Sequence, residues 1–337
     1  MKILVTGGLG YIGSHTCVKL LEEGNEVIIF DNLSNSSMNV LEGIHNITNQ
    51  IPQFYQGDVT VLSDVLALFK KEKNIDAVIH FAAQKSVAES VIKPNLYYCQ
   101  NINGLNNILF AMEKNNCDKI IFSSSATVYG NPEKVPILET APMQIPASSP
   151  YARSKQLGEL IIKDITQFSL LRSIILRYFN PVGAHHSSKI GELPQGIPNN
   201  LMPYITQVAV GIRPYLNVFG NDYNTPDGTC IRDYIHIEDL AEAHWKALDY
   251  LQNNPSVKID TFNIGTGIGY SVLDVVKSAN KSLKTPLPYK IMPRRNGDVP
   301  SYFSNSEKAA QFLNWEAKLN LDAMTLSSIN WELNIKK

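Results

Sequence analysis

Tyr151 and Lys155 stand four residues apart in the segment Pro150-Tyr-Ala-Arg-Ser-Lys155, and together they could move a proton. On a helix, this spacing places both side chains on one face. A free tyrosine has a pKa of about 10 and is a poor base at neutral pH, but a nearby ammonium group stabilises its phenolate. On an arbitrary amphipathic helix the same pair would be an ordinary surface feature. Its chemistry therefore depends on what the rest of the chain places beside it.

A dinucleotide site is predicted at the start of the chain. The apolar run Ile3–Val5 leads into Gly8-x-Gly10-x-x-Gly13, and a helical pattern follows until Gly24. Glycines between a strand and a helix allow a tight turn and a close approach of the backbone, and the N-terminus of the helix accepts a pyrophosphate. The alternative is a tight turn that binds nothing.

Acidic residues follow the next two extended runs. Asp31 comes after Val27–Phe30, where a carboxylate accepts hydrogen bonds from an adenosine ribose and repels a 2′-phosphate, which favours NAD over NADP. Asn32 adds neutral hydrogen-bonding groups. Asp58 would contact the adenine or would be an ordinary turn residue, and the sequence leaves both interpretations open.

A hydroxyl-rich run, Ser123-Ser-Ser-Ala-Thr-Val-Tyr-Gly130, follows the apolar segment Lys119–Phe122. It should therefore leave the carboxyl end of a strand, where open α/β sheets bind ligands. Hydroxyl groups there can bridge a substrate and a base. A serine-rich turn that satisfies its own backbone is the competing interpretation.

Short apolar runs alternate with helical patterns through the first half of the chain, which predicts a doubly wound parallel α/β sheet of the Rossmann type. After Asn180 prolines and glycines become frequent, as in loops that carry binding groups. We expect a nucleotide-binding domain over residues 1–180 and a smaller mixed α/β substrate domain over 181–337. Later runs such as Thr261–Ile264 are expected to return to the main sheet.

The composition favours a small-molecule ligand. The 337 residues are 44% hydrophobic, and 30 basic against 31 acidic residues give a net charge of −1, so no nucleic-acid or membrane partner is expected. Four separated cysteines without a Cys-x-x-Cys pair, and no histidine cluster at zinc spacing, indicate reduced thiols and no metal site. The chain shows no signal peptide and no apolar segment of about 20 residues, which predicts a cytoplasmic protein.

These residues carry a resemblance to a known family. The chain is similar to the UDP-galactose (UDP-glucose) 4-epimerases, which are extended short-chain dehydrogenases/reductases. The similarity runs over nearly the whole length. It includes Thr6–His15, Ser123–Gly130, Tyr151-x-x-x-Lys155, Arg177-Tyr-Phe-Asn-Pro-Val-Gly-Ala184, Gly196-Ile-Pro-Asn-Asn-Leu-Met-Pro203 and Arg232-Asp-Tyr-Ile-His236.

The resemblance implies an enzyme that holds NAD and reversibly epimerises UDP-galactose and UDP-glucose at C4 through a 4-keto sugar. Tyr151 would take and return the proton of the 4-hydroxyl, Ser125 would relay to that oxygen with support from Thr127, and Lys155 would hold the nicotinamide ribose. The implied cofactor contacts are Gly7, Gly10, Tyr11, Ile12, Gly13, Asp31, Asn32, Asp58, Val59, Phe81, Ala82, Lys85, Tyr151, Lys155 and Phe179.

The resemblance also implies a nucleotide-sugar site and a homodimer. The implied substrate contacts, besides Ser125 and Tyr151, are Asn180, Asn200, Leu201, Phe219, Arg232, Arg295, Asp298 and Tyr302. Arginines suit a diphosphate because each presents a planar fork of donors. The large ring of Tyr302 is expected to favour UDP-glucose and UDP-galactose over N-acetylated sugars.

The chain departs from the family pattern near the cofactor. The segment Phe81-Ala-Ala-Gln-Lys-Ser86 replaces Phe-Ala-Gly-Leu-Lys-Ala, and Gln100 stands where an asparagine is often a cofactor contact. Both departures put cofactor affinity in question rather than the reaction.

Other functions compete with this interpretation. A sugar-nucleotide 4,6-dehydratase would need an Asp-Glu pair where Ala126 and Thr127 stand. A decarboxylase or a reductase that acts on another nucleotide sugar is a further, less favoured alternative. A non-enzymatic NAD-binding regulator is permitted by the fold, but it has no use for Tyr151, Lys155 and Ser125.

Overall fold

A parallel sheet of seven strands forms the centre of the protein, as seen in a computed structural model that describes residues 1–194, 196, 198, 200–295 and 297–336. Every neighbouring pair of strands in this sheet is parallel. The strand order is β3-β2-β1-β4-β5-β6-β10. The strands are β1 (Lys2–Thr6), β2 (Glu26–Asp31), β3 (Gln53–Gln56), β4 (Ala77–His80), β5 (Lys119–Ser125), β6 (Arg172–Tyr178) and β10 (Ile259–Ile264).

The strand order reverses between β1 and β4, because β2 and β3 extend the sheet on one side and β5, β6 and β10 on the other. In open α/β sheets, ligands bind beyond the carboxyl ends of the strands at such a reversal. The predicted Rossmann-type fold is therefore confirmed. The apolar runs Ile3–Val5, Val27–Phe30 and Lys119–Phe122 lie in β1, β2 and β5 of this sheet, and the run at 261–264 forms most of its edge strand β10.

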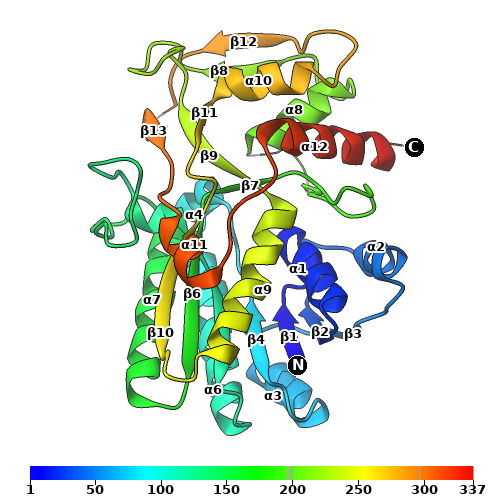
Figure 1. Cartoon of the computed structure of the whole chain (residues 1–337), viewed down its shortest axis with the longest axis vertical. Helices are drawn as coiled ribbons and strands as arrows, with labels where there is room; N and C mark the ends of the chain where they lie inside the picture. The colour runs from blue at the N-terminus through cyan, green and yellow to red at the C-terminus, as the bar shows by residue number, and fades with distance from the viewer. Residues whose placement is uncertain (195, 197, 199, 296, 337) are drawn as a thin grey trace.

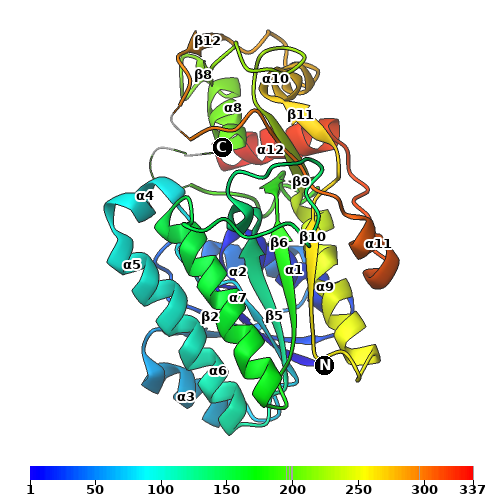
Figure 2. The same cartoon turned by 90° about the vertical axis from the view of Figure 1, so that its left-hand side faces the viewer.

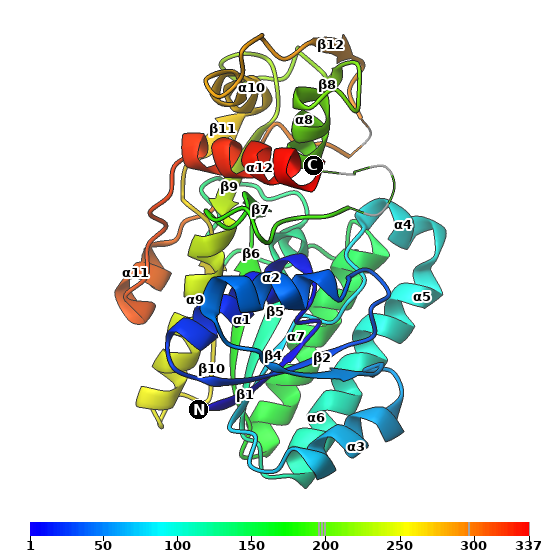
Figure 3. The same ribbon diagram turned by 90° about the vertical axis from the view of Figure 1, so that its right-hand side faces the viewer.

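Helices cover both faces of the sheet because its strands are apolar on both sides (Figures 1–3). One face packs against α1 (Tyr11–Glu22), α2 (Asn39–Thr48) and α9 (Ile237–Asn253), which lie in front in Figure 3. The opposite face packs against α3 (Leu62–Lys71), α6 (Gly104–Lys114) and α7 (Pro150–Phe168), which lie in front in Figure 2. Short helices α4 (Val87–Ile92) and α5 (Pro94–Tyr98) lead through a π-helical turn, η1 (Cys99–Asn103), into α6.

A smaller layer sits above the carboxyl ends of the sheet strands in Figure 1. Its four-stranded sheet pairs β9 with β7, β11 and β13, and β8 pairs with β12. The elements of this layer are β7 (Asn180–Val182), α8 (Leu201–Ala209), β8 (Leu216–Phe219), β9 (Ile231–His236), β11 (Gly269–Ser271), α10 (Val272–Asn280), β12 (Tyr289–Met292), β13 (Ser301–Tyr302) and α12 (Leu321–Ile335). The short helix α11 (Glu307–Leu313) returns to the main sheet and packs against α9 and β10.

The chain alternates between the two layers after residue 180, since α9 and β10 belong to the main sheet while β9 and β11 belong to the smaller one. The assignment of residues 1–180 and 181–337 to cofactor and substrate domains stays a prediction. Among the helices that the structure describes, none has the length and apolarity needed to cross a bilayer.

Candidate active site

Helix α7 carries Tyr151 and Lys155. The helix predicted to begin at Pro150 is confirmed: Pro150 is its first residue, and the Ser149 hydroxyl accepts a hydrogen bond from the Ala152 amide at 3.1 Å. Tyr151 therefore lies in the first turn, and the buried Lys155 lies one turn further along. The Lys155 Nζ donates to the main-chain carbonyl of Ser123 at 2.6 Å, which joins α7 to the end of β5.

Burial dominates the electrostatics of this pair. It lowers the pKa of Lys155 to about 8, although the Glu159 carboxylate acts in the opposite direction. Burial also raises the pKa of Tyr151, and only a hydrogen bond from the Ser125 hydroxyl opposes it. Lys155 Nζ lies 6.0 Å from the centre of the Tyr151 ring. Desolvation is thus the larger effect on Tyr151 in the chain by itself, and the expected lowering of its pKa by Lys155 stays a prediction.

Ser125 ends β5 and caps the short 3₁₀ turn η2 (Ala126–Tyr129). Its Oγ accepts hydrogen bonds from the Thr127 amide at 3.2 Å and the Thr127 hydroxyl at 3.0 Å. Because Thr127 fills the acceptor side of Ser125, the Ser125 proton stays available for Tyr151 or for a ligand oxygen. The structure thus brings Ser125, Thr127 and Tyr151 together, as predicted from their separate motifs.

The glycine motif forms a turn that has no room for side chains. Gly7 has φ +68°, and a Cβ there would meet the Ala82 amide nitrogen at 2.9 Å. A Cβ on Gly13 would meet the Gly7 carbonyl oxygen at 2.3 Å. Gly10 caps α1 without a side chain, so the first amides of α1, including those of Tyr11 and Ile12, are left for a ligand. These features fit the pyrophosphate of a dinucleotide.

Asp31 ends β2 and is fixed by the loop after β1. Its carboxylate accepts hydrogen bonds from the Leu9 amide at 3.0 Å, the Leu33 amide at 2.9 Å and the Ser36 hydroxyl at 2.8 Å. The anion lies beside the glycine turn, where it suits ribose hydroxyls and repels a 2′-phosphate. The residues therefore fit NAD.

Asp58 follows β3 and meets Asn32. The Asn32 amide donates to Asp58 at 2.9 Å, and both the amide and the hydroxyl of Thr60 donate to the same carboxylate at 2.8 and 2.7 Å. Burial opposes them, but these hydrogen bonds lower the pKa of Asp58. Val59 is buried next to it. This arrangement is compatible with a contact to the adenine and with an ordinary turn residue, so the adenine contact of Asp58 stays a prediction.

The segment after β4 contains the departures from the family pattern. The ring of Phe81 packs against His244 with centroids 4.7 Å apart, Ala82 approaches Gly7, and the exposed Lys85 pairs with Glu192 at 3.2 Å. A residue that the sequence analysis missed organises this segment. The buried Asn101 bonds the Gln84 amide at 2.8 Å, the Gln84 carbonyl at 3.1 Å and the Ser154 hydroxyl of α7 at 2.9 Å.

Asn101 thus ties the cofactor side of the site to the helix that carries Tyr151. Gln100 lies next to Asn101 in the π-helical turn, and its effect on cofactor binding stays a prediction. A local motif search misses Asn101 because its partners lie 17 and 53 residues away.

Tyr302 connects the small layer to the hydroxyl-bearing turn. Its hydroxyl donates to the carbonyl oxygen of Ala126, the residue after Ser125. Its ring lies 5.7 Å from that of Phe179, which follows β6. Tyr302 and Phe179 therefore lie at the end of the sheet where Ser125 lies.

Two predicted substrate arginines meet at one carboxylate. Asp298 lies 3.5 Å from an Arg232 nitrogen and 3.0 Å from Arg295 Nε. The Arg295 guanidinium also lies 5.0 Å from the centre of the Phe219 ring. Arg232 pairs in register with Tyr302 through β9 and β13. These four predicted residues and Tyr302 are therefore neighbours, although they come from four strands and loops.

Asn180, Asn200 and Leu201 lie at element ends: Asn180 begins β7, and Asn200 precedes Leu201 at the start of α8. The Asn200 side chain makes no capping hydrogen bond, so its amide is not committed to the helix. The motif 196–203 also includes Ile197 and Asn199, which lie outside the described residues.

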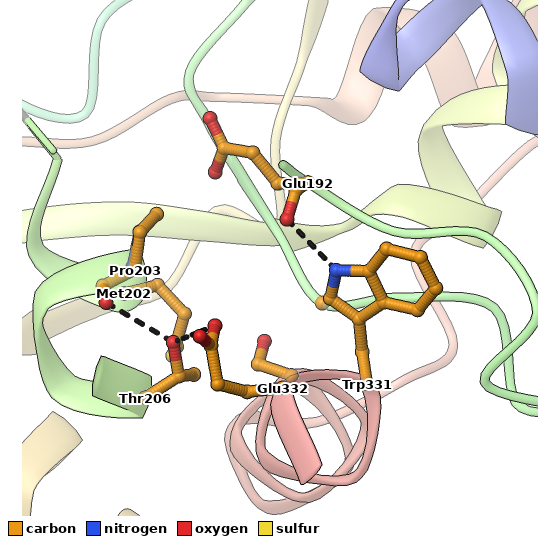
Figure 4. A pocket seen from close by; sticks show the side chains of 8 residues that line it. Glu192, Met202, Pro203, Thr206, Trp331 and Glu332 are labelled. Atoms are coloured by element: carbon orange, nitrogen blue, oxygen red, sulfur yellow. Dashed lines mark hydrogen bonds between the residues drawn. The ribbon is translucent and has the colours of Figure 1, made fainter. Parts of the chain in front are cut away.

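A small polar cavity lies between α8 and α12 (Figure 4). Thr206 donates to the buried Glu332 at 2.9 Å, and the Trp331 indole donates to the Glu192 carbonyl at 2.8 Å. Its lining includes neither Tyr151 nor Lys155. The hydrogen bond from Trp331 instead holds the loop that contains Glu192, the residue that pairs with Lys85.

The chain belongs to the NAD dependent epimerase/dehydratase family, whose model matches residues 3–265. Among curated relatives, the UDP-glucose 4-epimerase of Bacillus subtilis is 50% identical over 333 residues, covering 98% of this chain and 97% of that protein. The UDP-glucose 4-epimerase of Yersinia pestis is 49% identical over 339 residues, with the same coverage of 98% and 97%.

Solved structures give the same result. The UDP-glucose 4-epimerase of Stenotrophomonas maltophila, with bound NAD and formylated UDP-arabinopyranose, matches with a TM-score of 0.96 at 45% identity, covering 100% of this chain and 99% of that one. The UDP-glucose 4-epimerase of Bifidobacterium longum, in complex with NAD+ and UDP, matches with a TM-score of 0.94 at 45% identity, covering 99% and 98%.

Proposed function

We propose that this protein interconverts UDP-galactose and UDP-glucose by NAD-dependent epimerisation at C4 through a 4-keto sugar. The observation that carries the proposal is the full-length similarity to UDP-glucose 4-epimerases in a chain that places Ser125 beside a partly buried Tyr151. The family as a whole also includes dehydratases, so the residues must decide between the two reactions.

The residues after Ser125 favour epimerisation. A dehydratase needs an acid and a base to eliminate water, and a carboxylate pair would stand at 126 and 127. Ala126 is buried there, and Thr127 uses its hydroxyl to support Ser125. The chain has no proton carrier for elimination at these two positions.

Tyr151 is the proposed acid and base. It takes the proton of the 4-hydroxyl during oxidation and returns it to the 4-oxygen during reduction. Ser125 donates to the 4-oxygen or to the phenolate, and Lys155 supplies a buried cation one helical turn away. When bound, NAD supplies the acceptor and the donor of the hydride, and its oxidised ring adds positive charge. That Tyr151, Lys155, Ser125 and Thr127 perform these steps is part of the proposal.

Arg232 and Arg295 are the proposed diphosphate ligands, with Phe219 and Leu201 near the uridine and Asn180 and Asn200 as polar contacts. The contacts of both arginines with Asp298 support this assignment, because one carboxylate holds the two guanidinium groups on the same side of the small layer. Tyr302 would limit the room beside the sugar, since it lies against Phe179 and Ala126.

We also propose a cytoplasmic homodimer. All four cysteines are unpaired, as expected in a reducing compartment. Exposed Phe110 of α6 and Leu160 of α7 offer apolar contacts on the outer face of the sheet. Light scattering of the parent and of Leu160→Lys tests the dimer: a monomeric parent would contradict it, and a dissociated variant would support this face.

The function is tested by incubating the purified protein with UDP-galactose and no added NAD, and by separating the products chromatographically. Formation of UDP-glucose establishes both epimerisation and a retained cofactor. If saturating NAD is needed, the cofactor is lost on purification. If neither condition yields UDP-glucose, the assignment to this substrate pair is wrong.

A further inference from the structure

A buried histidine, an exposed histidine and a partly buried glutamate meet next to the glycine-rich turn and α1. His185 and His186 lie in the loop after β7, and Glu238 lies in the first turn of α9. Glu238 Oε1 is 2.7 Å from His186 Nδ1 and 3.5 Å from His185 Nε2. One nitrogen or oxygen from each residue lies within 4.8 Å of the others. The sequence analysis missed this group because 52 residues separate His186 from Glu238.

We propose that His185, His186 and Glu238 bind a divalent transition-metal ion of the zinc class. Imidazole and carboxylate are ligands that Zn²⁺ accepts at about 2.0–2.2 Å, and a tetrahedral ion at that distance holds its ligands about 3.3 Å apart. The 3.5 Å between His185 Nε2 and Glu238 Oε1 already matches this spacing. The 2.7 Å between His186 Nδ1 and Glu238 Oε1 must increase by a fraction of an ångström. His186 can make that adjustment because 78% of its side chain is exposed. The open side of the ion would carry water.

Neighbouring groups hold the buried ligands in place. The Nδ1 atom of His185 lies 2.8 Å from the Ser187 hydroxyl, so a proton on Nδ1 can be donated there while Nε2 faces Glu238. The Ser187 amide contact to the same nitrogen, at 3.2 Å, would then be released. Such outer hydrogen bonds fix the tautomer and the ring of a metal-binding histidine.

His236 orients Glu238 rather than acting as a fourth ligand. Its Nδ1 accepts the Glu238 amide at 3.1 Å, and its Nε2 lies 3.0 Å from the Ser327 hydroxyl. Both ring nitrogens are thus occupied. The glutamate is held at the helix start, and its carboxylate faces the two histidines of the loop.

The ion would join α9 to the loop that lies against the glycine motif. The loop begins at Gly183, whose carbonyl accepts a hydrogen bond from the Tyr11 hydroxyl of α1 at 2.6 Å. Binding to the folded state alone raises its stability by an amount set by the ratio of ion concentration to Kd. The expected effect is therefore a higher unfolding temperature, and no part of the proposal depends on catalysis by the metal.

The test uses the full-length protein with its retained cofactor, treated with a chelator and then titrated with Zn²⁺ by calorimetry and with Co²⁺ by visible absorption. All variants carry Cys99→Ser, because Cys99 is an exposed thiol that would compete for these ions. His186→Ala removes an exposed ligand, and Glu238→Gln keeps the size of the side chain. His45→Ala is the matched control, since the partly exposed His45 lies outside the cluster.

We expect one equivalent of Zn²⁺ to bind the parent, and both cluster variants to weaken binding by about tenfold or more while His45→Ala does not. Zn²⁺ should raise the melting temperature of the parent and of His45→Ala but not that of His186→Ala. No binding by the parent, or equal binding by the parent and His186→Ala, would overturn the proposal. These results are independent of whether the protein epimerises UDP-galactose.

Discussion

Arg177 of β6 and Glu159 of α7 form a buried, two-pronged ion pair, with Nε–Oε1 at 2.9 Å and Nη2–Oε2 at 2.6 Å. The Ser124 hydroxyl donates to the same carboxylate at 2.5 Å, and Arg177 also donates to the Tyr129 hydroxyl at 2.8 Å. The pair therefore connects β5, β6 and the turn after Ser125 to the helix that carries Tyr151. The position of the proposed acid–base group depends on this connection.

Glu159→Gln should lower the free energy of unfolding by about 3–5 kcal/mol, because it leaves the Arg177 charge buried without its partner. Urea unfolding at neutral pH measures the loss. Glu26→Gln, which removes a carboxylate that is 55% exposed in its pair with Lys2, is the control and should cost less than about 1 kcal/mol. Equal losses in the two variants would show that the buried pair does not hold the site together.

Tyr151→Phe should reduce turnover by about 10²- to 10⁴-fold, the usual contribution of a positioned acid or base, and should leave bound NAD in place. Turnover of UDP-galactose and the absorbance of released nucleotide are the measurements. Tyr97→Phe is a close control, since the ring of the buried Tyr97 lies edge-on to Tyr151 with centroids 6.4 Å apart. A fully active Tyr151→Phe would show that another group moves the proton, whereas a regulator that senses NAD would show no turnover in the parent either.

Tyr302→Cys should admit UDP-N-acetylglucosamine if the ring of Tyr302 limits the sugar site. Tyr302→Phe keeps the ring and removes only the hydrogen bond to Ala126, so it separates volume from the lost contact. We expect kcat/KM for the N-acetylated sugar to rise in the cysteine variant alone. A rise in both variants would point to the hydrogen bond, and a rise in neither would remove Tyr302 from specificity.

His244 should make the protein less stable in acid. Its Nδ1 bonds the Leu240 carbonyl at 2.8 Å, and its Nε2 accepts from the Tyr178 hydroxyl at 2.6 Å, so the buried ring is neutral. Burial lowers its pKa to about 4 from an ordinary value of 6.5. The unfolded chain therefore takes up the proton first, and stability present above pH 6.5 is lost as the pH falls toward 4.

At pH 5 this one group should cost about 2 kcal/mol relative to neutral pH, since each pKa unit corresponds to about 1.4 kcal/mol. The difference between the parent and His244→Gln in urea unfolding at pH 7.5 and pH 5 isolates it from other buried histidines such as His15 and His80. Identical pH slopes in the two proteins would mean that the ring becomes charged without unfolding.

Local patterns in the sequence predict the parts of the site that are themselves local. The glycine turn, the strand runs and the helix at Pro150 each depend on neighbours within a few residues, and the structure confirms all three. Parallel strands then bring Ser125 and Tyr151 to the same edge of the sheet. The placement of Ser125 and Tyr151 at this edge could therefore be predicted without knowledge of any contact between distant residues.

Contacts between distant segments could not be predicted in this way. Asn101, Glu159 and the Tyr302–Ala126 contact join segments 17 to 176 residues apart, and none has a spacing that periodicity could reveal. The rise in the pKa of Tyr151 by burial could not be predicted from the sequence either, because burial depends on the whole packing of the site. Only the resemblance to a family placed Arg232, Arg295 and Asp298 together before the structure did.

Because β10 is the edge strand of the main sheet, a truncation of the chain before β10 leaves that sheet incomplete. A fragment that stopped at residue 180 would keep the glycine turn, Ser125, Tyr151 and Lys155, but it would leave β6 as an unpaired edge without β10. It would also lose α9, which covers α1 and the sheet behind it. An open apolar edge of this kind pairs readily with other chains. The first half is therefore not a portable nucleotide-binding module, and gene fusions or truncations at that point should yield aggregates.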